Sequence, residues 1–187
     1  MNSLWQLPAV AEIGGVAYPI HADFRDVLEI IGYLNDPDEP EFMRWEIALG
    51  LFFDGDIPQE HKPEAKKYLA DFLVCGEDEQ PGQRQAKVLD WDQDAMAIIA
   101  DVNKTAGTEI RSLPFLHWWT FMAYFNAIGE GQLSTIVSIR LKRQRGKKLE
   151  PWEQQYFKEN RHRIELRQNY SAEELADQER LKVLLGG

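Results

Sequence analysis

The chain has 187 residues, of which 44% are hydrophobic and 28% are charged, and its formal net charge is −10. This composition excludes a disordered chain and predicts one globular domain over residues 1–187. The single cysteine, Cys75, excludes an intramolecular disulfide and a zinc site built on paired cysteines. Residues 1–10 lack the basic start and apolar core of a signal peptide, and no run of about 18 apolar residues is present. We therefore expect a cytoplasmic protein that does not span a membrane.

Charge is distributed unevenly along the chain. Residues 1–110 contain 8 Lys and Arg against 22 Asp and Glu, whereas residues 111–187 contain 13 against 9. The excess of basic residues is concentrated in residues 140–167, with 10 basic and 4 acidic side chains. Such polarity favours head-to-tail self-association or a charged partner, and the sequence leaves both open.

The first predicted element is a β-hairpin. Gly14-Gly15 tolerates the positive φ angles of a tight turn, and apolar segments at residues 10–13 and 16–20 flank it. Apolar residues at helical spacing then predict helices over about residues 24–34, 42–52 and 63–73. Asp23 is the expected N-cap of the first of these helices, and Gly76 is the expected end of the third.

The second half of the chain is also predicted to be helical. Residues 77–85 are polar and contain Pro81-Gly82, which predicts an exposed loop. Further helices are expected over about residues 92–103, 113–128, 133–143 and 151–168. A capping-box pattern at residues 171–174 predicts a C-terminal helix within residues 170–187, and its role stays open. The fold class is therefore mainly α, a compact bundle of about seven or eight helices with a short N-terminal hairpin.

The predicted helix over residues 113–128 carries most of the aromatic side chains. At 100° per residue its apolar positions cover every side of the helix, and His117 and Asn126 fall on opposite faces. A helix that is apolar all round is normally buried in the middle of a bundle. The alternative interpretation is a partly exposed aromatic groove that receives a partner, because Trp and Tyr are also frequent at binding hot spots.

Catalytic and metal-binding patterns are incomplete in this sequence. Asp90, Asp92 and Asp94 have the spacing that begins a calcium loop, but Ala95 and Asp101 stand where such a loop needs Gly and Glu. His117 has no partner at ligand spacing, and we expect it to be a core histidine. No nucleophile elbow, phosphate-binding loop or complete dinucleotide loop is present. We therefore expect no enzyme activity, no cofactor and no metal.

A basic run at residues 140–148 is the clearest candidate for partner binding. Its basic residues are Arg140, Lys142, Arg143, Arg145, Lys147 and Lys148. Three interpretations stay open: a solvated basic turn, contact with an acidic protein surface, and contact with nucleic acid. The acidic balance of the whole chain argues against the third interpretation, which defines the alternative function, a small nucleic-acid-binding regulator.

Residues 87–145 resemble the phage family known as the gene-product-fifteen proteins. The resemblance rests on Asp90-Trp91 and Asp94-Ala95, on the block from Leu116 to Phe121, and on Ile136 to Arg140. The block from Leu116 to Phe121 contains His117, Trp118 and Trp119 and is the most distinctive part. Residues 16–20 and 23–25 also fit, and the resemblance extends over about residues 12–165. The segment Glu77–Gln85 and the tail past Tyr170 depart from the family pattern.

This resemblance implies a protein of a long-tailed phage or prophage, encoded between the tail-tube gene and the tape-measure gene. It implies a non-catalytic tail assembly chaperone, which keeps the tape-measure protein in solution, recruits tail-tube subunits, and leaves before the virion matures. The expected partners are the tape-measure protein and the tail-tube protein, with a second copy of the chain as a further candidate. We expect no membrane and no nucleic acid among the partners.

Overall fold

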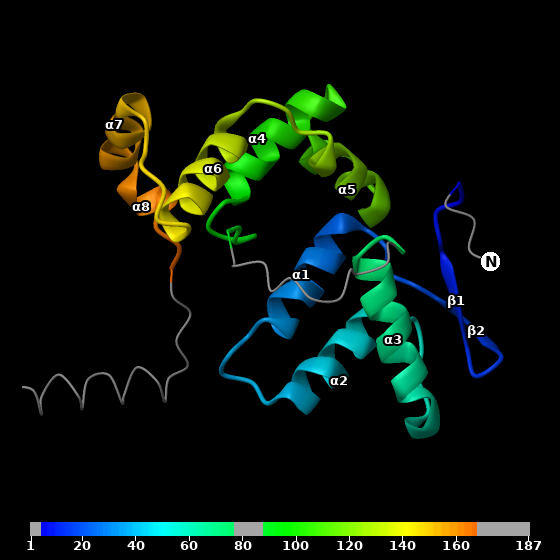
Figure 1. Cartoon of the computed structure of the whole chain (residues 1–187). Helices are drawn as coiled ribbons and strands as arrows, with labels where there is room; N and C mark the ends of the chain where they lie inside the picture. Colours follow the sequence, from blue (N-terminus) through cyan, green and yellow to red (C-terminus); the bar gives the residue numbers. More distant parts are fainter. Residues whose placement is uncertain (1–4, 77–87, 168–187) are drawn as a thin grey trace, which may run out of the picture. The chain divides into compact units, whose positions relative to one another are not determined.

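The computed structural model describes residues 5–76 and 88–167, which form mostly helices (Figure 1). The strands are β1 (Val10–Ile13) and β2 (Val16–Pro19), and two 3₁₀ turns are η1 (Gln59–His61) and η2 (Ile110–Ser112). The helices are α1 (Phe24–Leu34), α2 (Glu41–Phe52), α3 (Lys62–Leu73), α4 (Ala95–Ala106), α5 (Trp118–Asn126), α6 (Gln132–Gln144), α7 (Pro151–Glu159) and α8 (Arg161–Ile164). This confirms the predicted helical fold with an N-terminal hairpin. The predicted loop at 77–85 and the predicted helix within 170–187 lie outside the described residues.

Two compact units are present in the chain. The hairpin unit comprises residues 9–21 and 25–69, and the aromatic unit comprises the described parts of residues 1–8, 22–24 and 70–167. Helices α1 and α3 each contribute residues to both units. The expectation of a single domain over residues 1–187 stays a prediction.

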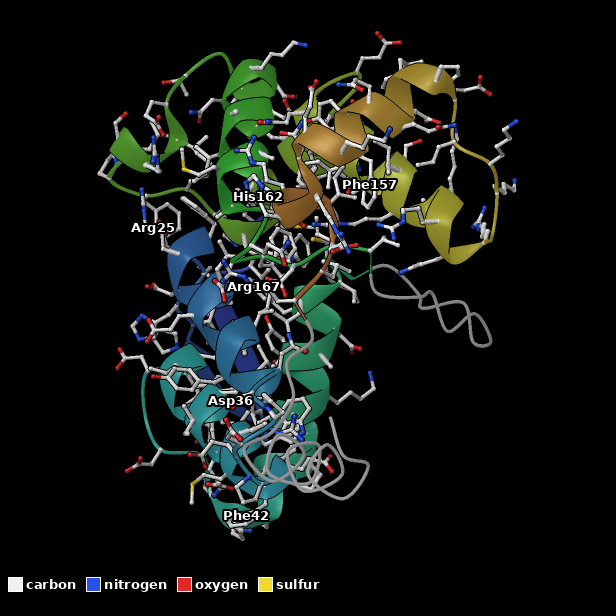
Figure 2. All side chains as sticks on the ribbon, turned by 90° about the vertical axis from the view of Figure 1, so that its left-hand side faces the viewer. Arg25, Asp36, Phe42, Phe157, His162 and Arg167 are labelled. Carbon is white, nitrogen blue, oxygen red and sulfur yellow. The ribbon has the colours of Figure 1, made fainter. Side chains whose placement is uncertain are left out.

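The hairpin unit is held by antiparallel pairing of β1 and β2, in which Ile13 pairs with Val16. Gly14 and Gly15 adopt φ angles of 58° and 76°, which side chains disfavour, and the Gly14 amide donates to the Glu64 carboxylate of α3 at 2.9 Å. The hairpin is thereby tied to α3. The buried apolar residues of this unit are Ala11, Ile13, Val27, Ile30, Ala48, Leu49, Phe52, Phe53, Ala65 and Leu69. Phe42, at the start of α2, points to solvent with 64% of its surface exposed (Figure 2).

In the aromatic unit, α4 packs against both α5 and α6, and α8 packs against α6 and α7. The buried apolar residues are Ala22, Phe24, Phe72, Ala97, Ile98, Val102, Ile110, Leu116, Trp118, Phe121, Leu133, Ile136, Ile139 and Ile164. None of the helices in residues 5–76 and 88–167 combines the length and the apolar character that a bilayer crossing requires.

The aromatic helix is shorter than the sequence predicts, so the expectation of a helix over 113–128 was wrong. Helix α5 begins at Trp118, and residues 113–117 are not helical. The backbone of this segment bonds elsewhere, because Phe24 N donates to Leu116 O at 2.9 Å and Trp118 N donates to Ala22 O at 2.7 Å. Nor is α5 buried all round: within it only Trp118 and Phe121 are buried.

Two other helix boundaries differ from the prediction. Helix α4 begins at Ala95 rather than at residue 92, because the Asp90 carboxylate accepts hydrogen bonds from the amides of Asp92 and Gln93 and holds a turn there. The helix expected over 151–168 is interrupted at Asn160, whose side-chain amide donates to Tyr156 O at 3.1 Å. Asn commonly ends helices in this way.

Candidate functional site

The predicted motif residues meet in one aromatic cluster of the aromatic unit. The Trp91 ring centroid lies 5.9 Å from that of Trp118 and 5.2 Å from that of Phe125. Phe121 stacks on Phe24 at 4.9 Å with an interplanar angle of 7°. Such pairs add about 0.5–1.5 kcal/mol each beyond their apolar burial. The cluster is therefore a packing centre that joins the segment before α4 to α5.

His117 is the N-cap of α5. Its Nδ1 accepts a hydrogen bond from the Trp119 amide at 3.0 Å, and its Nε2 lies 3.0 Å from the Pro8 carbonyl oxygen. An amide must donate, so Nδ1 carries the lone pair and Nε2 carries the proton that is donated to Pro8. Burial lowers the pKa of His117 below its ordinary value, although the bond to Pro8 opposes that shift. The side chain is thus neutral and serves to begin a helix.

The two tryptophans that follow His117 satisfy the end of α3. Trp118 Nε1 donates to Leu73 O and Trp119 Nε1 donates to Phe72 O, each at 3.0 Å. The last carbonyls of a helix have no partner within that helix, so the indole groups supply what the helix lacks. The conserved order of donors along α5 is set by two adjacent positions, which explains why both must be Trp rather than Phe.

Asp94 and Arg140 form a buried ion pair between the start of α4 and the middle of α6. The two guanidinium nitrogens of Arg140 lie 2.5 and 2.9 Å from the two Asp94 oxygens, and both side chains are at most 3% exposed. The remaining N–H groups of Arg140 donate to the carbonyls of Val88, Arg163 and Ile164. All five donors of the guanidinium are used.

The acidic stretch at residues 90–94 therefore has structural partners. Asp94 is bound by Arg140, and Asp90 holds the turn before α4. Among the described residues, no group of three or more His, Cys, Asp and Glu side chains is arranged to hold a metal ion. Gln93, which sequence reasoning missed, donates to Glu165 O at 2.8 Å and accepts from Arg167 N at 2.9 Å. Figure 2 labels Arg167 near the end of the described chain.

The predicted basic run divides into inward and outward side chains, which corrects the expectation for Arg140. Its guanidinium is buried and fully bonded, so it is not available to a partner. Lys142 donates to both oxygens of the buried Glu153, at 2.7 and 2.8 Å. These bonds, with one from the Glu150 amide, lower the pKa of Glu153.

The remaining basic residues face solvent. Arg143 lies over the Phe157 ring at 4.0 Å (Figure 2) and pairs loosely with Glu165 at 3.4 Å. Arg145, Lys147 and Lys148 are exposed and have no ion-pair partner among residues 5–76 and 88–167. Half of the predicted partner-binding set is therefore free for an external partner.

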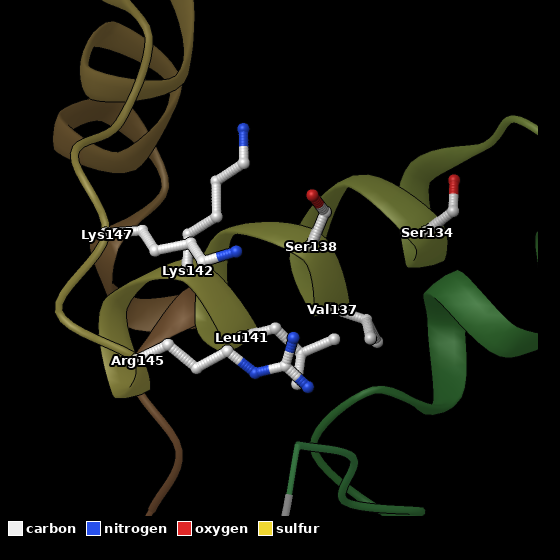
Figure 3. Close-up of a pocket in the computed structure, with 7 residues that line it drawn as sticks. All are labelled: Ser134, Val137, Ser138, Leu141, Lys142, Arg145 and Lys147. Carbon is white, nitrogen blue, oxygen red and sulfur yellow. The ribbon is translucent and has the colours of Figure 1, made fainter.

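A shallow hollow lies along α6 on the side away from α4 and α8 (Figure 3). Its volume is about 420 Å³, and its lining residues are Ser134, Val137, Ser138, Leu141, Lys142, Arg145 and Lys147. We call it the α6 groove. Two rows at i, i+4 spacing form it, and this spacing is the signal by which the sequence could have revealed the serine and apolar members.

The chain was compared with known protein families. The Bacteriophage Gp15 protein family matches residues 4–166. The chain belongs to this family. The search of curated proteins and the search of solved structures each gave no match.

The Gp15 match includes all the motif residues from Asp90 to Arg140 and confirms the resemblance found in the sequence. It also includes residues 77–85, and the tail past Tyr170 lies beyond it. In this Gp15 protein the motif residues build the fold: they hold α3, α4, α5, α6 and α8 to one another through rings, caps and one ion pair. The surface that remains for a partner is the α6 groove and its free cations.

Proposed function

We propose that this Gp15 protein is a non-catalytic tail assembly chaperone that acts in the host cytoplasm during virion assembly. Its proposed partners are the tape-measure protein and tail-tube subunits of the same phage or prophage. The observation that carries the proposal is the Gp15 family match over residues 4–166, which makes this a phage protein. The α6 groove supports it further, since an apolar groove is how many proteins receive an amphipathic helix.

The proposed lack of catalysis rests on the use of the buried polar groups. His117, Asp94 and Glu153 are the buried groups whose chemistry could serve an acid, base or nucleophile. Each is engaged in bonds that begin a helix or join two elements. A group held by such bonds is a poor candidate for proton transfer to a substrate, so the fold itself accounts for these residues.

Co-expression tests the chaperone proposal. The tape-measure protein of the same phage is produced in bacteria alone, with this chain, or with an unrelated acidic protein of similar size. We expect this chain, and not the control, to raise the soluble fraction of the tape-measure protein and to co-purify with it. A tape-measure protein that stays insoluble and does not co-purify would overturn the proposal.

The nucleic-acid alternative retains one favourable observation, the exposed and unpaired side chains of Arg145, Lys147 and Lys148. Against it stand the burial of Arg140, the pairing of Lys142 with Glu153, and the sequence pI of about 4.9. A nucleic-acid binder must be retained on heparin or DNA columns at low salt and released as salt rises. Retention that Lys147→Glu and Lys148→Glu abolish would favour this alternative over the chaperone.

A further inference from the structure

The floor of the α6 groove is apolar but is not covered by the described chain. Val137 and Leu141, one helical turn apart, are only partly buried. The opposite side of α6 is buried through Leu133, Ile136 and Ile139. Helix α6 thus has two apolar faces, and only one of them has a partner within the aromatic unit. A second apolar stripe of this kind is expected where another helix packs.

The rim of the groove is positively charged at one end. Helix α6 ends at Gln144, and Gly146 adopts a φ of 61°, after which the Lys147 amide donates to Lys142 O at 2.8 Å. This turn brings Lys147 back beside the last turn of α6, as Figure 3 shows. Glu153 neutralises Lys142, so the unpaired charges on the rim are those of Arg145 and Lys147.

A favourable interaction with the α6 dipole accounts for cations near Gln144, but it does not account for the apolar floor beside them. The Arg145 side chain extends back along α6 toward Leu141 and Val137 in Figure 3, so charge and apolar surface adjoin. The lining residues of α6 run from Ser134 to Arg145, about 16 Å along the helix axis at 1.5 Å per residue. Three turns of a partner helix have the same length.

We propose that the α6 groove binds one amphipathic helix of the tape-measure protein whose apolar stripe is flanked by Asp or Glu. The apolar stripe of that helix covers Val137 and Leu141, and its carboxylates face Arg145 and Lys147. The partner packs its small residues against Ser134 and Ser138 at the neutral end. This inference rests on the proposed chaperone function and names the surface and partner chemistry through which it acts.

Two probes separate this inference from the proposed function. The first is the tape-measure protein, co-expressed with the full chain. The second is a labelled synthetic helix with a Leu stripe flanked by Glu, and its counterpart with Lys in place of Glu, titrated against the full chain by fluorescence anisotropy. We expect the Glu peptide to bind, with an affinity that falls as salt rises, and the Lys peptide not to bind.

The variants are matched in charge. Arg145→Glu with Lys147→Glu reverses the rim, whereas Lys148→Glu with Lys158→Glu changes the net charge equally at exposed positions outside the groove. We expect the first pair to weaken the Glu peptide at least about tenfold and the second pair to leave it within about twofold. Ser138→Phe fills the groove without a change of charge and should weaken binding as the first pair does. Thermal melting checks that each variant folds.

The outcomes are distinct. If the chain solubilises the tape-measure protein but the rim variants and Ser138→Phe bind both probes as the unchanged chain does, the groove proposal is overturned while the chaperone proposal stands. If the Glu peptide binds through the groove but the tape-measure protein is unaffected, the chaperone proposal fails and the partner is another acidic helix. A chain that binds neither probe, and whose dimers dissociate when the groove is altered, would show that a second copy is the occupant and would overturn the proposal.

Discussion

Adjacent basic residues of α6 have opposite roles. Arg140 lies on the inner face and joins α4, α6 and the end of α8, whereas Arg145 lies on the outer face at the rim of the α6 groove. Five positions separate them, which is a rotation of 500° or, equivalently, 140° around the helix. Charge type alone therefore does not decide which residue contacts a partner, and the helical phase does.

Arg140→Ala should lower the free energy of unfolding by about 3–5 kcal/mol, because Asp94 is then buried without its partner. Arg145→Ala removes an exposed guanidinium and should change stability by no more than about 0.5 kcal/mol. Urea denaturation followed by circular dichroism measures both. Arg140→Lys keeps the charge with fewer donors and should fall between them. Equal losses for Arg140→Ala and Arg145→Ala would contradict the assignment of Arg140 to the core.

His117 should make stability depend on pH. Its pKa is lowered in the folded chain, so as the pH falls the unfolded chain binds the proton first. Its contribution is therefore fully present above the unfolded pKa of about 6.5 and declines as the pH falls below it. Protonation at Nδ1 removes the acceptor for the Trp119 amide.

His117→Asn keeps a side-chain oxygen for capping but cannot titrate. We expect this variant to lose less stability between about pH 7.5 and pH 5.5 than the unchanged chain does. Urea midpoints at the two pH values measure the difference, and the other three histidines are common to both proteins. An unchanged pH dependence in the variant would mean that His117 is not the group responsible.

At the scale of elements, the start of α6 depends on a carboxylate from α4. Asp101 is buried and accepts a hydrogen bond from the Leu133 amide at 2.8 Å, so it caps a helix that is distant in sequence. A Cβ at Gly131 would overlap the Asp101 carboxylate. Gly131 is therefore required by close approach, although its extended backbone suits any residue.

Gly131→Ala should lower the free energy of unfolding by about 1–2 kcal/mol, because Asp101 must move and its cap on α6 is weakened. Gly129→Ala is the matched control, since a Cβ there meets nothing within 4 Å. That control should be neutral or slightly stabilising. Thermal or urea unfolding of both variants measures the difference, and equal effects would remove the role assigned to Asp101.

Sequence patterns predicted the elements whose contacts are local. The Gly14-Gly15 hairpin and helices α1, α2, α3 and α6 follow from turn chemistry and helical spacing. The start of α5 could not be predicted in this way. Leu116 N donates to the Asp23 carboxylate, a bond between residues 93 positions apart, and this pairing overrides the helical preference of residues 113–117.

The candidate site was predicted in part for the same reason. The sequence identified the basic run and the motif residues, because both are compositionally distinctive. It did not separate Arg140 from Arg145, since that separation depends on where Asp94 and Glu153 lie in the fold. The groove residues Ser134 and Ser138 carry no chemical signal of their own, and only the packing of α6 reveals them.

At the scale of the whole molecule, the two units share continuous helices. Helix α1 begins in the aromatic unit with Phe24 and continues in the hairpin unit, and α3 runs from the hairpin unit to its last residues in the aromatic unit. Loss of either helix removes buried side chains from both cores. The chain should therefore unfold as one cooperative system even though its contacts form two units.

Calorimetry tests this cooperativity. We expect one transition, with equal calorimetric and van't Hoff enthalpies. Ile30→Ala in the hairpin unit and Ile139→Ala in the aromatic unit should each lower the stability by about 2–5 kcal/mol and shift that same transition. Two transitions, each shifted by only one of the substitutions, would show two independent domains and contradict the single-domain prediction.

The Asp94–Arg140 pair has a consequence for how Gp15 sequences can diverge. Three of the five bonds from Arg140 end on backbone carbonyls, which remain whatever side chains occupy those positions. A lineage that lost Arg140 alone would leave those carbonyls and the Asp94 charge buried without donors. We therefore expect substitutions at the two positions to occur together across the family, and groove residues such as Lys147 to drift with the sequence of the partner instead.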